Sequence, residues 1–234
     1  MTDYNCFVGE WPFHKLSEYT FEHLKTVHSE YGITDGYVSS VKSVFYNDVY
    51  DSEKELYETL QGTQYKQVTV ANPTLPGSLL TLERCINEFD IKGIRLIPGY
   101  HGYNINSDIA DKAADIAEKY GLILFITDRM MDERITHMIL PPLIEHNDIV
   151  AFVKRHLELR VVLNCFKLGE AVAIEKELKE YPNVLFESCG FGVNALAGRE
   201  EADPLFERTV FGSGFPIICT ASSAIYFNKE IKKL

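Results

Sequence analysis

An arginine, a histidine and two tyrosines gather around a short apolar run in the middle of the sequence. The run covers residues 94–97 and contains Arg95, and a Pro-Gly pair then precedes Tyr100, His101 and Tyr103 on an expected loop. A guanidinium in a buried strand is costly unless it meets an anion or lines a cavity. Arg95 therefore either pairs with a structural carboxylate or binds an anionic ligand. His101 is either a proton donor in a pocket wall or a packed loop histidine.

A second titratable group follows the next apolar run. The segment 128–137, DRMMDERITH, is the most densely charged one near an expected strand end. Asp132 or His137 could act as a general acid or base, and Arg129 and Arg134 could bind an anion. The alternative is a solvated loop that leads into a helix, with Asp132 as its N-cap.

The two groups are expected to converge on one cavity. In a barrel, the carboxyl ends of neighbouring parallel strands meet at one edge, about 4.8 Å apart. Positive side chains at that edge focus small anions, and the planar fork of arginine suits a carboxylate. We therefore predict a small anionic substrate, most simply a carboxylate, gripped by Arg134 and Arg95, with His101 or His137 moving the proton. In the rival account the arginines are neutralised internally by Asp128, Asp132, Glu133 and Glu187.

Strand-like runs alternate with helix-like segments along the whole chain. Expected strands cover residues 3–9, 35–41, 66–71, 94–97, 122–127, 160–165, 184–188 and 208–213. Expected helices cover residues 20–31, 51–61, 78–89, 108–120, 148–157 and 169–181, and a last helix begins at Thr220 or Ser222. Eight such units predict an α/β fold with a parallel sheet, and they fit a closed (β/α)8 barrel of the TIM type better than an open sheet. Since no composition break occurs, residues 1–234 are expected to form a single domain.

Four segments carry a resemblance to a known family. They are Asp3–Gly9 with Trp11–Phe13, KGIRLIP at 92–98, GLILFITDRMMDER at 121–134, and RTVFGSGFP at 208–216, which looks like an "FGSD-x-P" strand. In order and spacing the chain resembles the amidohydrolase superfamily, in particular the amidohydrolase-related (amidohydrolase 2) group of metal-dependent hydrolases. The resemblance covers almost the whole length. It implies a barrel enzyme with its active site at the strand ends.

The metal ligands that the resemblance implies are largely missing. Its strand-one His-x-His pair falls at Asn5 and Phe7, its strand-five histidine at Thr127, its strand-six histidine at Asn164 or Cys165, and its strand-eight aspartate at Gly214. A divalent ion needs about three to four N, O or S ligands, and phenylalanine and glycine supply none. We therefore expect no tightly bound zinc and no cofactor, although an atypical divalent metal site stays open.

The composition narrows the class of partner. The formal net charge is −11, which argues against nucleic acid and anionic membranes because both select basic patches. No apolar run approaches the roughly 18 residues of a membrane span, and the first residues do not resemble a signal peptide. The five cysteines are scattered without a CxxC pair, as expected for reduced thiols in the cytoplasm. A small-molecule substrate is the expected partner, and homo-oligomerisation stays open.

Three residues end the expected sixth and seventh strands. Cys165 and Cys189 are interpreted as buried, inert thiols rather than as nucleophiles. Glu187 is a carboxylate inside an apolar run, so it either points into the barrel mouth or pairs with Arg95.

Three functions remain after these arguments. The first is a metal-independent or atypical hydrolase, lactonase or lyase with His101, Asp132 and His137 as catalytic residues. The second is a metal hydrolase with rearranged ligands, and the third is a non-catalytic barrel that binds a small molecule or a protein partner. The missing ligands favour the first and third, and the retained acid, base and arginines favour the first. The predicted substrate-binding residues are Asn5, Arg95, Tyr100, Arg129, Arg134 and Asn164.

Overall fold

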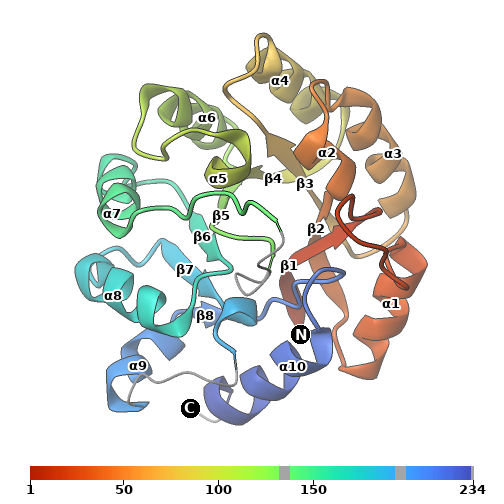
Figure 1. Cartoon of the computed structure of the whole chain (residues 1–234). Coiled ribbons are helices and arrows are strands. Elements are labelled where there is room, and N and C mark those ends of the chain that lie inside the picture. Colours follow the sequence, from red (N-terminus) through yellow and green to blue (C-terminus); the bar gives the residue numbers. More distant parts are fainter. Residues whose placement is uncertain (132–137, 193–198, 233–234) are drawn as a thin grey trace.

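The computed structural model describes residues 1–131, 138–192 and 199–232, and these form a barrel of eight parallel strands (Figure 1). The strands are β1 (Thr2–Val8), β2 (Asp35–Ser40), β3 (Lys66–Ala71), β4 (Ile91–Leu96), β5 (Ile123–Thr127), β6 (Val161–Asn164), β7 (Val184–Glu187) and β8 (Thr209–Val210). Each strand pairs with the next one in the sequence, from β1 to β8. The predicted (β/α)8 architecture is confirmed.

The chain that follows β8 closes the barrel against β1. The backbone N–H of Tyr4 donates to the carbonyl of Phe211 at 2.8 Å, and that of Phe7 donates to the carbonyl of Phe215 at 2.8 Å. The eighth strand is thus shorter than the predicted range 208–213, because its continuation bonds to β1 through isolated contacts. Residues from both ends of the chain meet here, and a single domain over residues 1–234 stays a prediction.

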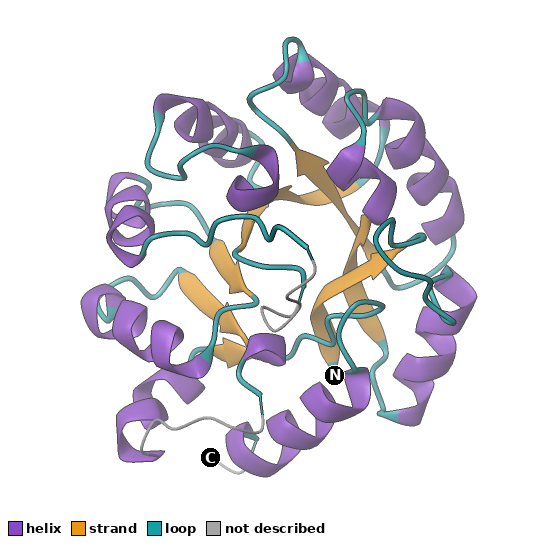
Figure 2. Cartoon of the chain, viewed as in Figure 1, coloured by secondary structure: helices purple, strands orange, loops and turns teal. Residues whose placement is uncertain are grey.

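Helices form a ring outside the strands (Figure 2). They are α1 (Phe21–Glu30), α2 (Val41–Phe45), α3 (Tyr50–Leu60), α4 (Ser78–Glu88), α5 (Pro98–His101), α6 (Asp108–Lys119), α7 (His146–Arg155), α8 (Leu168–Leu178), α9 (Arg199–Phe206) and α10 (Thr220–Tyr226), with two further turns, η1 (Ser188–Gly190) and η2 (Phe227–Ile231). Among the helices described, none has the length and apolar character needed to cross a bilayer.

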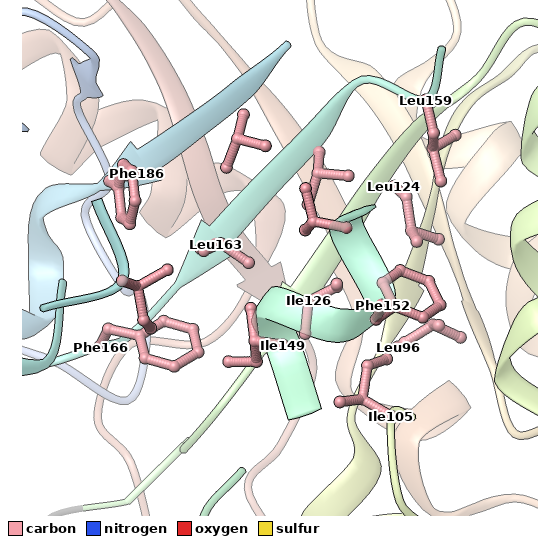
Figure 3. Close-up of a cluster of buried hydrophobic side chains, with 14 of the residues drawn as sticks. Leu96, Ile105, Leu124, Ile126, Ile149, Phe152, Leu159, Leu163, Phe166 and Phe186 are labelled. Atoms are coloured by element: carbon pink, nitrogen blue, oxygen red, sulfur yellow. The ribbon is translucent and has the colours of Figure 1, made fainter. Parts of the chain in front are cut away.

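The main hydrophobic core lies between the strands and this ring. Figure 3 shows part of it, where Leu124, Ile126 and Leu163 from the sheet meet Ile149 and Phe152 of α7. All five side chains are fully buried. Burying each such side chain contributes about 1.5–3 kcal/mol to folding, so this layer fixes how the strand ends are placed.

The two-residue period of a strand explains which side chains enter the barrel. In β5, Leu124 and Ile126 point outward to the helices, so Phe125 and Thr127 point inward. β4 follows the same alternation and turns Arg95 into the barrel. The position of the arginine therefore follows from the apolar residues on either side of it.

Three short helices were not predicted from the sequence. They are α2, α5 and α9, of five, four and eight residues. Segments this short carry too few turns for a helical period to be visible. One consequence is that Tyr100 and His101 lie in the helical turn α5 rather than on an irregular loop.

Candidate functional site at the carboxyl ends of the strands

Six polar side chains from six strands meet inside the barrel near its carboxyl-terminal end. They are Asn5 of β1, Ser39 of β2, Arg95 of β4, Thr127 of β5, Asn164 of β6 and Glu187 of β7. All six are fully buried. In barrels of this kind the strand ends carry the chemistry, whereas the opposite end carries stability.

Arg95 is held by neutral oxygen acceptors. Its Nε donates to Ser39 Oγ at 2.9 Å, and its Nη1 donates to both Asn5 Oδ1 and Thr127 Oγ1 at 2.9 Å. Within the described part of the chain, Nη2 has no hydrogen-bond partner and no carboxylate forms a salt bridge with the guanidinium. Burial lowers the pKa of Arg95, although negative groups nearby act in the opposite direction. The first of the two sequence interpretations, a direct carboxylate pair, is not seen among these residues.

Two aromatic rings flank the guanidinium. The centre of the Phe7 ring lies 4.5 Å from Arg95 Cζ, and that of Phe125 lies 5.3 Å away. Such contacts stabilise a buried cation by about 2 kcal/mol when water is excluded. The aromatic rings and the neutral acceptors together hold a positive charge in a dry setting.

Asn5 connects Arg95 to Glu187. Its Oδ1 accepts from Arg95, and its Nδ2 donates to Glu187 Oε2 at 2.9 Å. The same Nδ2 lies 3.1 Å from Cys165 Sγ and 3.3 Å from Cys189 Sγ. The predicted role of Asn5 at the substrate site stays a prediction, but its amide clearly sets the distance between the two charged groups.

Glu187 Oε2 is surrounded by four donors. In addition to Asn5, they are Cys189 Sγ at 3.1 Å, the backbone N–H of Cys165 at 3.3 Å and Asn164 Nδ2 at 3.4 Å. Burial raises the pKa of Glu187, and the hydrogen bonds from Cys189 and Asn164 work against that rise. Asn164 is thus engaged with this carboxylate rather than with Arg95.

The two thiols at the ends of β6 and β7 lie side by side. Cys165 Sγ is 3.4 Å from Cys189 Sγ, and both residues are buried. Cys165 has a φ of 62°, a left-handed conformation that is uncommon outside glycine. Burial raises the pKa of the Cys189 thiol well above its ordinary value. The expectation of buried thiols agrees with their positions, but their contact was not predicted from the sequence.

The positions that the resemblance assigns to metal ligands do not fit a metal ion. Phe7 offers only its ring, and Gly214 offers no side chain; a Cβ there would lie 2.6 Å from Ile218. Asn5 and Thr127, at two further ligand positions, both accept from Arg95 Nη1. The guanidinium of Arg95 therefore contacts Asn5 and Thr127, at two of the positions that the resemblance assigns to metal ligands.

His101 and Tyr100, two predicted site residues, lie on α5 above β4. The ring Nε2 of His101 is 3.0 Å from the carbonyl oxygen of Val44, and burial lowers the pKa of the imidazole. Tyr100 packs against Trp11, with ring centres 6.2 Å apart, and burial raises its pKa. Both therefore belong to the wall of packed side chains at the strand ends, separate from the contacts of Arg95.

Directly after β5, Arg129 contacts two acidic side chains, Asp128 and Glu170. Asp128 accepts from the backbone N–H of Ile144 at 2.8 Å and lies 2.6 Å from Arg129 Nη2, which also contacts Glu170 at 2.9 Å. Burial raises the pKa of Asp128 to about 6. Arg129 is thus neutralised internally, as the rival sequence account supposed for the arginines. The predicted residues Asp132, Arg134 and His137 lie outside the described residues.

A buried aspartate–histidine pair lies nearer the amino-terminal end of β1. Asp3 Oδ2 is 3.0 Å from His28 Nε2, and His28 Nδ1 is 2.9 Å from Tyr65 Oη. Asp3 Oδ1 accepts from the backbone N–H groups of Asn5 and Ser213. Burial would raise the pKa of Asp3, but the hydrogen bond and charge of His28 outweigh it, so the pKa is lowered. This pair fastens β1 to the segment after β8.

One surface cavity does not include Arg95 among its lining residues. It measures about 1080 Å³ and is lined by the segments that follow β1 and β2 and by α1 and α3. Trp11 and Val41 line it and also belong to the apolar cluster that covers Phe7 and Met130. The indole of Trp11 thus lies between this cavity and the inner site.

Comparisons with known proteins agree with the barrel. No protein family matches the sequence, and no curated protein matches it. A 2,6-dihydroxybenzoate decarboxylase from Rhizobium superposes with a TM-score of 0.68 at 11% identity, covering 98% of this chain and 91% of that one. A 5-carboxyvanillate decarboxylase from Novosphingobium aromaticivorans, solved with bound manganese, gives 0.66 at 13% identity over 89% and 74%.

A third similar structure is a probable 2-pyrone-4,6-dicarboxylic acid hydrolase from Acinetobacter baumannii, with a TM-score of 0.58 at 12% identity over 99% of this chain and 92% of that one. At these identities the likeness shows the fold alone. That fold is the one that the resemblance to the amidohydrolase superfamily implies.

Proposed function

We propose that this chain is an amidohydrolase-like enzyme, a hydrolase or a lyase, that acts on a small carboxylate. We place the carboxylate at Arg95, with no metal ion at the positions where the superfamily holds one. The similar solved structures support the substrate class, because their names refer to a dihydroxybenzoate, a carboxyvanillate and a pyrone dicarboxylic acid. A lactonase remains within this proposal as one kind of hydrolase.

The observation that carries the proposal is the pair of contacts made by Arg95 Nη1. It lies 2.9 Å from both Asn5 Oδ1 and Thr127 Oγ1, at positions that the resemblance assigns to metal ligands. A fixed guanidinium supplies there a positive charge that can attract an anion and stabilise negative charge as it develops. Its Nη2 has no partner among the residues described, so a donor is left over for a ligand oxygen.

The surroundings strengthen the effect of that charge. Phe7 and Phe125 flank the guanidinium and exclude water from it. In a medium of low dielectric constant, a charge acts on a bound anion much more strongly than it does in water. An apolar ring that carries a carboxylate would suit a site with one cation and several aromatic neighbours.

Either reaction also needs a group that moves a proton. A decarboxylation breaks a C–C bond and protonates the carbon that loses CO2, and a hydrolysis needs a base to activate water. His101, Asp132 and His137 remain the predicted residues for this step, and Arg134 remains the predicted second contact for the carboxylate. The lowered pKa of His101 leaves its imidazole neutral near pH 7, so it would serve as a base more readily than as an acid.

A binding experiment tests the carboxylate site. The wild type, Arg95→Met and Arg84→Met would each be heated with hydroxybenzoates, a pyrone dicarboxylate and their neutral amides. Arg84 is an exposed arginine paired with Glu88, so its variant controls for the loss of one charge. We expect carboxylates to raise the melting temperature of the wild type and of Arg84→Met, and to leave Arg95→Met unchanged.

Two results would contradict the proposal. Equal stabilisation of Arg95→Met and the wild type would place the carboxylate elsewhere. If Arg95→Met fails to fold, the wild type alone tests the proposal. An equal rise in its melting temperature with the amides and with the carboxylates would exclude an ionic site.

A non-catalytic binding barrel is the second candidate function. The lack of side-chain ligands at Phe7 and Gly214 favours it, because these two positions cannot help to hold a catalytic metal ion. Mass spectrometry of a carboxylate panel after incubation with the protein separates the two functions, since an enzyme releases product and a binding protein does not. The five free cysteines support the predicted cytoplasmic setting, which stays a prediction together with the state of association.

A further inference from the structure

A cluster of soft ligand atoms lies next to Arg95 and takes no part in the proposed carboxylate site. Cys165 Sγ, Cys189 Sγ and a carboxylate oxygen of Glu187 all lie within 4.8 Å of one another, and all three residues are buried. Cys165 follows the end of β6, and Glu187 and Cys189 lie 22 and 24 residues later, at the end of β7 and in η1. We propose that they form a thiolate site for a zinc-like cation, with ligand atoms other than the groups that contact the guanidinium of Arg95.

The spacing of the three atoms is close to that of a metal site. The two sulfurs are 3.4 Å apart, and Cys189 Sγ is 3.1 Å from Glu187 Oε2. Two thiolates that bind a tetrahedral zinc ion at about 2.3 Å each lie about 3.8 Å from one another. Small side-chain rotations therefore open the cluster enough to admit an ion.

The kinds of ligand select the kind of metal. Two sulfur atoms and one carboxylate favour zinc and other soft or borderline cations over magnesium or calcium, which prefer oxygen. Three protein ligands leave the fourth position of a tetrahedral ion open, as in catalytic rather than structural zinc sites. When zinc binds, two S–H bonds break and both protons leave to solvent, so the ion replaces two protons and gains two thiolates.

The charge around the cluster suits a divalent cation. Glu187 receives four donors on one oxygen, yet no cationic side chain in the described ranges forms a salt bridge with it. Two thiolates and a carboxylate with a divalent ion carry a net charge of about −1. Arg95, joined to Glu187 through Asn5, supplies the balancing positive charge.

Two further features of the site support a ligand. Asn164 is fully buried and its amide faces Glu187, but its Oδ1 has no hydrogen-bond partner in the part of the chain that the structure describes. A half-turn of that amide would present an oxygen to a cation at the cluster. Cys165 also holds a left-handed backbone conformation, which costs about 1–3 kcal/mol and is retained mainly where function needs it.

The proposed ion is distinct from the one that the superfamily resemblance implies. The expectation of no tightly bound zinc concerned Asn5, Phe7, Thr127 and Gly214. The new cluster uses Glu187 of β7, Cys165 after β6 and Cys189 of η1 instead. Only Cys165 is shared with the alternatives considered for the strand-six histidine.

Zinc titration of the reduced, chelator-treated protein tests the site. A chromophoric chelator would compete for zinc with the wild type, Cys165→Ser, Cys189→Ser, Glu187→Gln and Cys219→Ser. Cys219 is the exposed cysteine, so its variant controls for the loss of one thiol. We expect one equivalent of zinc in the wild type and in Cys219→Ser, and at least 100-fold weaker binding in each serine variant of the cluster.

Cobalt gives a second reading that needs no variant. A cobalt-loaded wild type should show the intense near-ultraviolet absorption of a thiolate-to-cobalt bond, and added zinc should remove it. If a serine variant fails to fold, the spectrum of the cobalt-loaded wild type still shows whether thiolates bind the metal. The site is overturned if the wild type binds less than one fifth of an equivalent of zinc, if cobalt binds without thiolate absorption, or if Cys165→Ser and Cys189→Ser both bind zinc as the wild type does.

A disulfide between Cys165 and Cys189 is the competing explanation for the contact. Mass spectrometry after alkylation without reductant would show it as two protected cysteines. That result, together with no zinc binding by the reduced protein, would replace the metal site by a redox pair.

Discussion

Arg95 and Glu187 lie buried inside the barrel and are connected through the amide of Asn5. The oxygen of that amide accepts from the guanidinium at 2.9 Å, and its nitrogen donates to the carboxylate at 2.9 Å. An amide between two charged groups keeps them apart while it satisfies both of them. Arg95 can therefore face an external anion and Glu187 an external cation, instead of cancelling one another.

Replacing Asn5 with alanine should destabilise the protein by about 3 kcal/mol, because it leaves a buried donor of Arg95 and a buried acceptor of Glu187 without a partner. Urea unfolding at pH 7 measures the loss. Asn87→Ala, which removes an exposed amide on α4, is the matched control and should change stability by less than about 0.5 kcal/mol. Similar losses for both variants would mean that the bridge has no special role.

The sequence predicted the parts of the site that depend on a strand or on a residue type. Arg95 lies inside the barrel because Ile94 and Leu96 beside it are apolar and turn outward, and this alternation is visible in the sequence. The contact between Cys165 and Cys189 depends on the register of β6 with β7, on the turn η1 and on a left-handed backbone at Cys165. None of these leaves a periodic signal.

The sequence also suggested that Arg129 would bind a ligand, and the structure shows it held by Asp128 and Glu170. Glu170 is far away in the sequence, at the start of α8, so only the fold could bring it to the arginine. A dense run of charged residues in the sequence indicates where charged side chains lie, but it does not show which of them form salt bridges with one another.

The lowered pKa of Asp3, which is hydrogen-bonded to His28, should make stability depend on acid pH. Since the folded pKa of Asp3 lies below its unfolded value of about 3.8, its contribution is present above pH 4 and is lost as the pH falls through the lower value. Asp3→Asn should therefore be less stable than the wild type at pH 7 by about 1–3 kcal/mol, and the gap should narrow between pH 4 and pH 3.

Guanidinium unfolding at a series of pH values gives that gap. Asp90→Asn is the control for the loss of one carboxylate, since Asp90 is an exposed carboxylate paired with Lys92, and its gap at pH 7 should stay below about 0.5 kcal/mol. A gap for Asp3→Asn that stays constant from pH 7 to pH 3 would rule out a lowered pKa at Asp3.

Asp128 should show the opposite dependence. Burial raises its pKa from 3.8 to about 6, so the stability that it contributes is present below pH 4 and is lost as the pH rises through 6. Asp128→Asn cannot ionise and still offers an oxygen to the backbone N–H of Ile144. Its stability relative to the wild type should therefore rise by up to about 3 kcal/mol between pH 4 and pH 7.

Chemical unfolding of both proteins from pH 4 to pH 8 measures the difference. The exposed residue Asp115 provides the control for the loss of one carboxylate, and Asp115→Asn should change stability at pH 7 by less than about 0.5 kcal/mol. If the difference in unfolding free energy between Asp128→Asn and the wild type stays constant from pH 4 to pH 8, the pKa of Asp128 is not raised.

Gly212 determines whether Glu187 can keep its position. A Cβ at residue 212 would overlap with the carboxylate of Glu187, whereas a Cβ at Gly169 on α8 would meet nothing within 4 Å. Gly212→Ala should therefore displace the carboxylate and cost about 1–3 kcal/mol through overpacking, while Gly169→Ala should be neutral or slightly stabilising because alanine favours a helix.

Urea unfolding measures the stability of both variants, and a zinc titration of the two folded variants adds a second comparison. A displaced Glu187 should weaken zinc binding in Gly212→Ala at least 10-fold and leave Gly169→Ala unchanged. If Gly212→Ala keeps the stability of the wild type, the carboxylate does not rest against this glycine, and the contacts that place Glu187 between Asn5 and the two thiols are wrong.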